Sequence, residues 1–236
     1  MVNNLNGEIQ LSDSQVQSIC SRRFGVGSDG LILIEPSQEA DFHVNFYNPD
    51  ASKSFCGNGS RCAVHFAQAI GVPNDQGTFT AIDGSHHYLF DPHEPGISLS
   101  TKGEIQSVEE LYFLHTGSPH LIQVVDNVDE VEIHIEGKRL RHHPNFQPDG
   151  TNANFVEWTE KGAKMRTFER RVEAETYSCG TGVTAVGLLH QHLFGGDSSR
   201  EIHTKGGTLS VQFSDKTWLH GPAKAVYSGE LNLNEL

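Results

Sequence analysis

Several kinds of segment are missing from this 236-residue chain, and each absence narrows the class of protein. No window approaches the run of about 18 apolar residues that a membrane-spanning helix needs. The N-terminus carries no charged-then-apolar leader, so we expect a cytoplasmic protein that binds no membrane. The four cysteines, at positions 20, 56, 62 and 179, are too few and too scattered for a disulfide scaffold, which favours reduced thiols.

Positive charge is also scarce. Lysine and arginine together number 17 against 30 acidic residues, for a net charge of −13. Proteins that bind nucleic acid usually carry a basic face, so we expect no nucleic acid as a partner. Some of the 14 histidines are paired, as in His86-His87, but none shows the His-Glu-x-x-His or Cys-x-x-Cys spacing of zinc sites. We therefore expect no metal site.

What the sequence does contain is a duplicated cysteine motif. Cys56-Gly-Asn-Gly opens one long apolar run and Cys179-Gly-Thr-Gly opens another. Each thiol is thus expected at a helix N-terminus, where unpaired N–H groups and the helix dipole favour a thiolate. The offset of 123 residues (179 − 56) recurs in two further pairs, Gly84 with Gly207 and Phe90 with Phe213. This register predicts that a helix and the hairpin behind it are duplicated as a unit.

The pattern predicts an α+β fold of two pseudo-symmetric halves, each a curved, mainly antiparallel sheet wrapped around a central buried helix. We expect the halves at residues 1–104 and 105–224, with a strand over residues 225–236 returning to the first half. Pseudo-twofold symmetry would let both thiols face one cleft between the halves.

Expected strands in the first half lie at residues 31–35, 41–47, 77–81, 86–90 and 96–100. In the second half they lie near residue 115 and at residues 121–125, 131–135, 164–168, 201–204, 208–213 and 217–219, with a polar loop over residues 146–154. The first helix is expected to begin at Ser12, with Gln15 closing a capping box, and to end at Gly25 with Arg22 and Arg23 in its last turn.

Residues 25–30 match the Gly-x-Gly-x-x-Gly pattern of dinucleotide-binding proteins. That motif requires a strand before the glycines and a helix after them, so that the pyrophosphate meets a helix N-terminus. Here a capped helix precedes the glycines and an apolar strand follows them. The sequence therefore disfavours a nucleotide-binding oxidoreductase.

Two opposed thiols suit racemisation or epimerisation, in which a proton leaves one face of a carbon and returns to the other. One thiolate acts as the base and one thiol as the acid, while N–H groups at the two helix ends hold the carboxylate. The structural alternative is that both cysteines are small residues packed at tight turns. Duplication in register argues against it, because packing does not require a thiol at the same place twice.

The chain resembles the diaminopimelate epimerase family over almost its whole length. The resemblance rests on segments in the family's order: residues 23–31, 48–50, 56–62, 117–120, 151–155, 168–170 and 175–182. It implies cofactor-independent conversion of LL- to meso-diaminopimelate, a step toward lysine and peptidoglycan, by a homodimer that takes a small amino acid as substrate. It implies that Cys56 and Cys179 are the acid/base pair, supported by His120 and Glu169.

The resemblance also implies the residues that bind substrate. Backbone groups of Gly57, Asn58, Gly180 and Thr181 hold the reacting carboxylate, while Asn48, Asn152 and Arg170 read the distal end. Ser118 stands where the family usually has asparagine. The family's first strand, with a Gly-x-Gly-Asn-Asp-Phe segment, is expected before Met1. The alternatives are a proline-racemase-like or other isomerase of the same fold, whose first motif pairs Cys-Gly with histidine, and a shortened product with little or no activity.

Overall fold

The computed structural model describes residues 1–72 and 74–233, and the side chains of all of these except residues 102 and 103. The chain divides into two compact units. Unit 1 comprises Met1–Ile97 together with Pro222–Leu236, and unit 2 comprises Ser98–Gly221.

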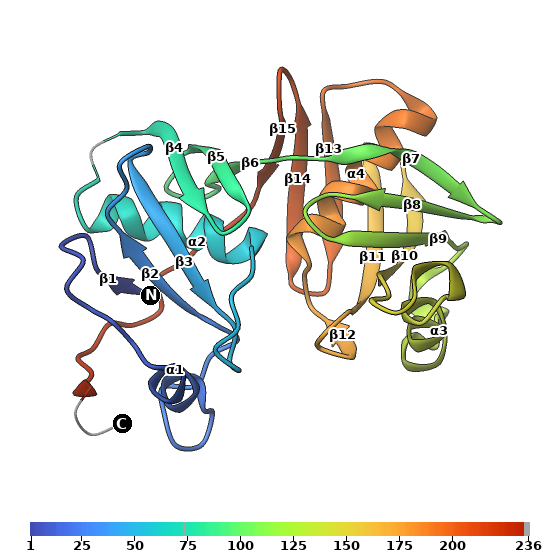
Figure 1. The fold of residues 1–236 in the computed structure, drawn as a ribbon. Coiled ribbons are helices and arrows are strands. Elements are labelled where there is room, and N and C mark those ends of the chain that lie inside the picture. The colour runs from blue at the N-terminus through green and yellow to red at the C-terminus, as the bar shows by residue number, and fades with distance from the viewer. Residues whose placement is uncertain (73, 234–236) are drawn as a thin grey trace. The chain divides into compact units, whose positions relative to one another are not determined.

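Unit 1 is built on one sheet whose strands follow the chain order (Figure 1). The strands are β1 (Val2–Asn3), β2 (Leu31–Glu35), β3 (Phe42–Tyr47), β4 (Gln76–Ala81), β5 (Gly84–Leu89) and β6 (Gly96–Leu99). Pairs β1–β2 and β3–β4 are parallel, and the other neighbours are antiparallel. Helix α2 (Gly57–Ala69) packs against β2 and β3, so the helix that follows Cys56 lies on the sheet.

Helix α1 (Asp13–Cys20) begins as predicted and ends earlier than predicted. The Ser12 hydroxyl accepts a hydrogen bond from the Gln15 N–H, and the Gln15 side-chain oxygen accepts one from the Ser12 N–H. The predicted capping box is therefore confirmed. The helix stops at Cys20 because Ser21 adopts an extended backbone, which places Arg22 and Arg23 outside it. The chain then folds back over the last turn, where the Gly27 N–H donates to the Ile19 carbonyl.

The glycine-rich stretch over residues 25–30 connects α1 to β2. A helix therefore precedes these glycines and a strand follows them, as expected from the sequence. This order is the reverse of the one that binds a dinucleotide, so the match to that motif carries no function.

Unit 2 contains a longer sheet that surrounds a helix (Figure 1). Its strand order is β7 (Lys102–Val108), β8 (Leu111–His115), β9 (Pro119–Val124), β10 (Asn152–Thr159), β11 (Gly162–Glu169), β13 (Ser199–Thr204), β14 (Gly207–Phe213) and β15 (Thr217–His220), with β12 (Ala174–Thr176) paired to β11. Pairs β9–β10 and β11–β13 are parallel and the others antiparallel. Helix α4 (Gly180–Phe194) packs against β8 to β11 and β13 to β15, which confirms the predicted sheet wrapped around a buried helix.

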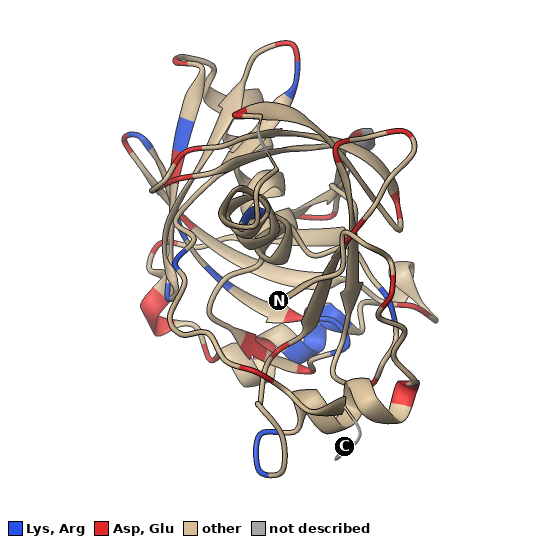
Figure 2. Ribbon diagram, turned by 90° about the vertical axis from the view of Figure 1, so that its left-hand side faces the viewer, with Lys and Arg blue, Asp and Glu red and all other residues tan. Residues whose placement is uncertain are grey.

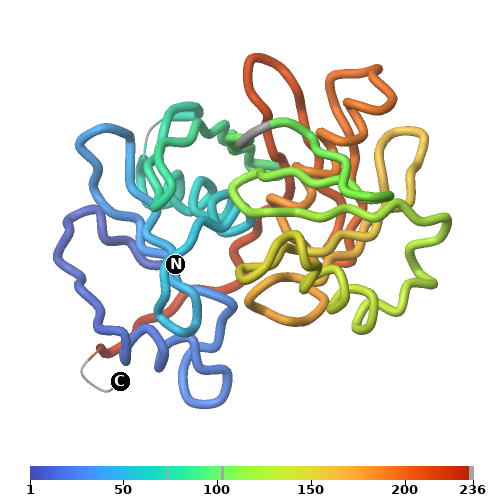
Figure 3. Tube along the Cα trace, turned by 45° about the vertical axis from the view of Figure 1, so that its right-hand side comes forward, coloured from blue at the N-terminus to red at the C-terminus, as the bar shows by residue number. Residues whose placement is uncertain are grey.

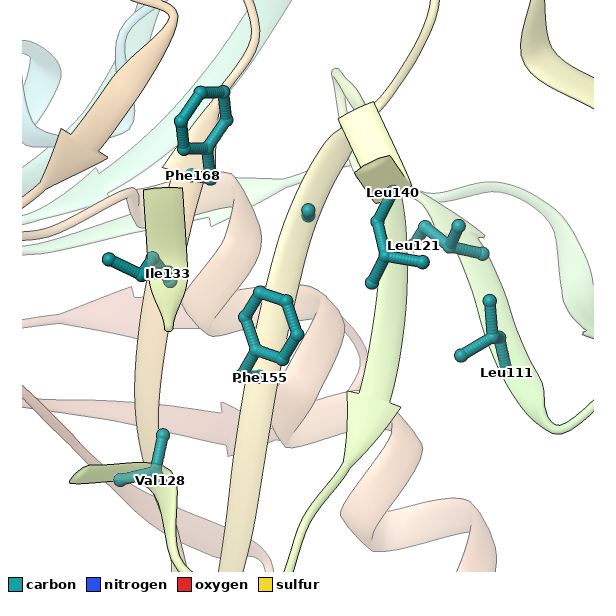
Figure 4. Packing of buried hydrophobic residues seen from close by; sticks show 8 residues of the cluster. Leu111, Leu121, Val128, Ile133, Leu140, Phe155 and Phe168 are labelled. Atoms are coloured by element: carbon teal, nitrogen blue, oxygen red, sulfur yellow. The ribbon is translucent and has the colours of Figure 1, made fainter. Parts of the chain in front are cut away.

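The strand predicted at residues 131–135 is wrong, because helix α3 (Ile133–Arg141) lies there between the short 3-10 turns Val128–Glu130 and Pro144–Phe146. Alternating Val131, Ile133 and Ile135 mimic a strand. The buried positions are instead Ile133, Gly137 and Leu140, at the spacing of one helix face. Ile133 and Leu140 belong to a hydrophobic cluster that also includes Phe155 and Phe168 and joins α3 to the sheet (Figure 4).

The polar loop predicted over residues 146–154 ends earlier than expected, because β10 begins at Asn152. Asn152, Ala153 and Asn154 are all buried in this strand. Strands β7 and β12 also have no counterpart in the sequence-based expectation.

The predicted duplication is confirmed within each unit. Cys56 is the N-cap of α2 with φ −132°, and Cys179 is the N-cap of α4 with φ −118°. Gly84 and Gly207 each begin the second strand of a hairpin, with φ values of 128° and 127° that favour glycine.

The end of the chain returns to unit 1, as the red trace after β15 shows (Figure 3). Residues 221–232 have no regular secondary structure, where a strand over residues 225–236 was expected, and residues 234–236 lie outside the described residues. The Gln15 side-chain amide donates to the Leu233 carbonyl at 3.2 Å, and Leu233 packs against the cluster under α1. Among the described residues, no helix is both long and apolar enough to cross a membrane.

Candidate active site

Cys56 defines the half-site of unit 1. Its Sγ accepts a hydrogen bond from the Gly59 N–H at 3.3 Å, and its carbonyl accepts from the Ser60 N–H. Gly57 and Asn58 form the first turn of α2, where backbone N–H groups have no partner inside the helix. A sulfur in this position meets a backbone donor and the positive end of the helix dipole, and both favour the thiolate.

The neighbours of Cys56 hold it in place. The Phe55 ring stacks on His86 of β5 at 4.5 Å between centroids, and His86 Nε2 lies 2.9 Å from Asp83 Oδ1. On the other side, a Cβ at Gly59 would lie only 3.1 Å from Ile32 of β2. The glycine therefore lets the first turn of α2 sit directly on the sheet.

Arg61 is the buried cation of this turn, with 4% of its surface exposed. Its Nη2 donates to Asn58 Oδ1 at 2.9 Å and its Nη1 to the Gly57 carbonyl at 3.4 Å. Burial lowers the pKa of this guanidinium, and Cys62 and Cys56 act in the opposite direction. Arg61 thus fixes Gly57 and Asn58, two of the four residues that were predicted to hold a carboxylate through their backbone.

Asn48 lies in the loop that leads from β3 to Cys56. Its amide Nδ2 lies 3.0 Å from both the Ser52 carbonyl and the Ser52 hydroxyl and 3.1 Å from Ser54 Oγ, so its two hydrogens are shared among these acceptors. The side chain therefore closes the loop before Cys56. Substrate contact by this amide would require an exchange of these bonds.

Cys179 defines the half-site of unit 2, and its sulfur is held differently. Its Sγ makes no capping bond to the backbone and lies 3.5 Å from Thr181 Oγ1. Thr181 Oγ1 lies 2.9 Å from His120 Nε2, and the Thr181 carbonyl accepts from the buried Thr116 hydroxyl at 2.7 Å. Gly180 and Thr181 are both buried in the first turn of α4, where their N–H groups have no intrahelical partner.

His120 is fully buried on β9 and is connected to two neighbouring strands. Its Nδ1 lies 3.2 Å from Asn154 Nδ2, and Asn154 Oδ1 accepts from the Thr167 hydroxyl at 3.1 Å. Burial lowers the pKa of His120 to about 3. The imidazole is therefore neutral at physiological pH. A Cβ at Gly182 would lie 2.9 Å from Asn154 Oδ1, so glycine is needed where α4 approaches this pair.

Asn152 and Arg170 form a second contact in unit 2. Asn152 Oδ1 accepts from the Arg170 backbone N–H at 2.8 Å, and its Nδ2 donates to the Pro119 carbonyl at 3.1 Å. One amide hydrogen of Asn152 remains for a ligand. Burial lowers the pKa of Arg170, and the positive charges of Arg171 and Arg141 act in the same direction. Figure 2 marks the acidic positions of the chain in red, and the guanidinium groups of Arg170, Arg171 and Arg141 lie close enough for their charges to interact.

Glu169 and Ser118 complete the predicted set. Glu169 ends β11 opposite Ala174 of β12, and burial raises the pKa of its carboxyl group, opposed by the Thr176 side chain. A raised pKa suits a carboxyl group that exchanges protons near neutral pH. Ser118 lies in the turn between β8 and β9, where its carbonyl accepts from the Thr116 N–H.

The predicted residues therefore divide between the units. Unit 1 holds Asn48, Cys56, Gly57 and Asn58, and unit 2 holds Ser118, His120, Asn152, Glu169, Arg170, Cys179, Gly180 and Thr181. Hydrogen bonds connect Cys179, Thr181 and His120 directly. Within the described ranges, no group of three or more His, Cys, Asp or Glu side chains is placed to hold a metal ion.

Sequence reasoning missed Arg61, Thr116 and Asn154, which contact this set, and Thr167, which contacts Asn154. Asn154 carried a usable signal, because it stands two residues from Asn152. In a strand, such residues share a face, but the segment was taken for a loop.

The fold defines the class of protein first. The crystal structure of a phenazine biosynthesis protein of the PhzF family from Bacillus anthracis matches with a TM-score of 0.69, over 94% of this chain and 89% of that one. The two sequences are 13% identical, so this likeness shows the fold alone. The chain therefore has the mixed α/β fold of that class, with long sheets and buried helices.

Sequence comparison then gives the family. The family model "Diaminopimelate epimerase" matches residues 1–85 and 112–231. The diaminopimelate epimerase of Chlorobaculum tepidum is 39% identical over 99% of this chain and 96% of its own length. That of Flavobacterium psychrophilum is 40% identical over 90% of this chain and 87% of its own length. The chain belongs to the diaminopimelate epimerase family and is an isomerase, which confirms the predicted family, fold class and enzyme class.

Proposed function

We propose that this protein interconverts LL- and meso-diaminopimelate by a two-base mechanism that uses Cys56 and Cys179. The observation that carries the proposal is the duplicated device: each thiol stands at the N-cap of a helix, one in each unit. Relatives at 39% and 40% identity that carry the name diaminopimelate epimerase support diaminopimelate as the substrate. The product would serve lysine and peptidoglycan synthesis.

The chemistry balances within the two thiols and the substrate. One thiolate removes the α-hydrogen as a proton, and the electron pair of the C–H bond passes into the adjacent carboxylate, giving an enediolate-like carbanion. The thiol on the opposite face then gives its proton to the carbon. The enzyme is left with the thiol and thiolate exchanged, ready for the reverse direction. No cofactor is needed in this scheme.

The carbanion requires donors aimed at the carboxylate. Each helix dipole supplies only about 0.3–1 kcal/mol, but a preorganised N–H donor contributes about 3–4 kcal/mol to such a transition state. The backbone N–H groups of Gly57, Asn58, Gly180 and Thr181 are proposed for this role. Arg61 stabilises the two donors of unit 1, because its bonds to Gly57 and Asn58 keep the first turn of α2 from rearranging.

The distal end of the substrate carries a second carboxylate and an amino group. We propose that the Arg170 guanidinium binds this carboxylate, because a planar fork of donors matches it. The free amide hydrogen of Asn152 and the amide of Asn48 are proposed as further contacts, with Ser118 as a weaker one. His120 and Glu169 are proposed to support proton transfer. The active form is proposed to be a homodimer in the cytoplasm. Sedimentation velocity tests the oligomeric state.

The decisive experiment measures α-hydrogen exchange and epimerisation of LL-diaminopimelate in heavy water. Cys56→Ala and Cys179→Ala should each lower the epimerisation rate by about 100-fold or more, the usual contribution of a positioned acid or base. Cys62→Ala is the matched control on the same helix, because burial raises the pKa of this thiol and keeps it protonated. Full epimerisation by either alanine variant, or equal loss in Cys62→Ala, would refute the mechanism.

A further inference from the structure

The hydrogen bonds behind Cys179 have a definite direction, and Asn154 sets it. The Asn154 amide lies between the Leu121 carbonyl, 3.1 Å from Nδ2, and the Thr167 hydroxyl, 3.1 Å from Oδ1. A backbone carbonyl can only accept, so the NH2 group must face Leu121. The second hydrogen of the same NH2 group then points to His120 Nδ1, at 3.2 Å.

This orientation fixes the tautomer of His120. A ring nitrogen that faces an N–H donor must accept, so Nδ1 carries no hydrogen and the neutral ring carries its hydrogen on Nε2. The Nε2–H group therefore donates to Thr181 Oγ1, at 2.9 Å. Burial, together with His115 and Arg170, acts against a positive charge on this ring, so it stays neutral and keeps the tautomer.

The direction continues to the sulfur. Thr181 Oγ1 accepts from His120, so its own hydrogen is directed to its other partner, Cys179 Sγ, at 3.5 Å. We propose that Asn154 is a positioning residue that, through His120 and Thr181, makes the Thr181 hydroxyl donate to Cys179 Sγ and so holds Cys179 as the resting thiolate. This inference rests on the proposed function, in which one thiol must start as the base.

The path of hydrogen bonds from Asn154 through His120 and Thr181 to Cys179 is called the relay below. The charged groups around this half-site do not replace it. Arg170 and Glu169 follow one another at the end of β11, where burial raises the pKa of the Glu169 carboxyl group. Lys205, in the turn before β14, is paired with Glu175 at 2.8 Å. The half-site of unit 1 is different, since the Cys56 sulfur receives a backbone N–H from Gly59 at 3.3 Å.

The first test removes the hydroxyl and keeps the shape of the side chain. Thr181→Val should shift the pH midpoint for iodoacetamide alkylation of Cys179 upward by about one unit or more, a roughly tenfold loss of thiolate, as expected for a hydrogen bond to a charged group. Peptide mass spectrometry separates Cys179 from Cys56. Thr181→Ser should restore the wild-type midpoint. The control is Thr184→Val, because that hydroxyl lies on the same helix but donates to the Gly180 carbonyl.

The second test reads the tautomer. In protein labelled with 15N-histidine, the His120 signals, identified by their loss in His120→Gln, should show a neutral ring protonated on Nε2. Asn154→Asp replaces the donor with an acceptor, so the hydrogen should move to Nδ1 and the alkylation midpoint of Cys179 should rise as in Thr181→Val. A wild-type ring protonated on Nδ1 would overturn the proposal, as would identical Cys179 midpoints in wild type, Thr181→Val and Thr184→Val.

These outcomes separate the inference from the proposed function. The alkylation midpoint and the ring signals are measured without substrate. If wild-type protein exchanges no α-hydrogen of diaminopimelate while Thr181→Val still shifts the midpoint, the substrate assignment fails and the relay stands. If exchange is normal and the midpoint is unmoved, the relay fails and the function stands.

Discussion

The buried imidazole of His120 couples the stability of unit 2 to pH. Its pKa in the folded protein is about 3, whereas an unfolded histidine titrates near 6.5. Because the folded pKa is the lower one, this contribution to stability is complete above about pH 6.5 and is lost as the pH falls toward 3. Each pH unit in that window costs about 1.4 kcal/mol.

We expect wild-type protein to lose about 2 kcal/mol more than His120→Gln between pH 7.5 and 5.0, measured by urea unfolding. Glutamine can accept from Asn154 and donate to Thr181 without titrating, so its curve should lack this slope. His134→Gln, at an exposed position of α3, is the control and should follow the wild type. Parallel curves for wild type and His120→Gln would contradict the buried neutral ring.

At the same scale, the sequence predicted the two thiols and missed the relay behind one of them. Cys56 and Cys179 were found because each precedes two glycines and the copies keep register. Asn154 and Thr167 are paired in register on neighbouring strands, and Asn154 reaches His120 only after the sheet has formed. No spacing along the chain reports that contact, since each partner comes from a different element.

Among the elements, α3 shows where local pattern fails. Three β-branched residues alternate at its start, so the sequence shows the two-residue period of a strand more clearly than the helical spacing of the buried residues. Gly137 is the residue that makes the packing possible: a Cβ there would lie 2.5 Å from the Phe168 Cβ on β11. The helices that open at Cys56 and Cys179 were predictable, because each is a long apolar run with a defined start.

Gly137→Ala should therefore push α3 away from β11. We expect a loss of about 1–3 kcal/mol in the free energy of unfolding, the usual cost of overpacking, although alanine is the better helix former. Lys138→Ala is the matched control, because this neighbour on the same helix is exposed. An unchanged or higher stability of Gly137→Ala in urea would show that α3 does not press on Phe168.

For the whole molecule, the proposed mechanism requires two sulfurs from different units to reach one carbon. Mild oxidation with diamide should therefore join Cys56 to Cys179, as the two thiols lose two protons and two electrons to the diamide. Non-reduced peptide mapping measures the bond, and dithiothreitol should restore the exchange activity. Cys20 and Cys62 serve as internal controls, since both are free thiols and neither belongs to the proposed pair. Finding Cys56 and Cys179 unjoined, or joined to a control thiol, would contradict a shared reaction centre.

The division of the chain into a continuous and a discontinuous unit also sets an order of folding during synthesis. Unit 2 is one continuous stretch, Ser98–Gly221, whereas unit 1 is completed by residues beyond it, and Leu233 packs beneath α1. During translation, unit 2 can close its core as soon as its last strand has left the ribosome, while the first-made part of unit 1 still waits for its final contact. Residues Met1–Ile97 precede unit 2 in the chain but are completed after it, so a ribosome that pauses after Gly221 would carry one complete unit and one incomplete unit.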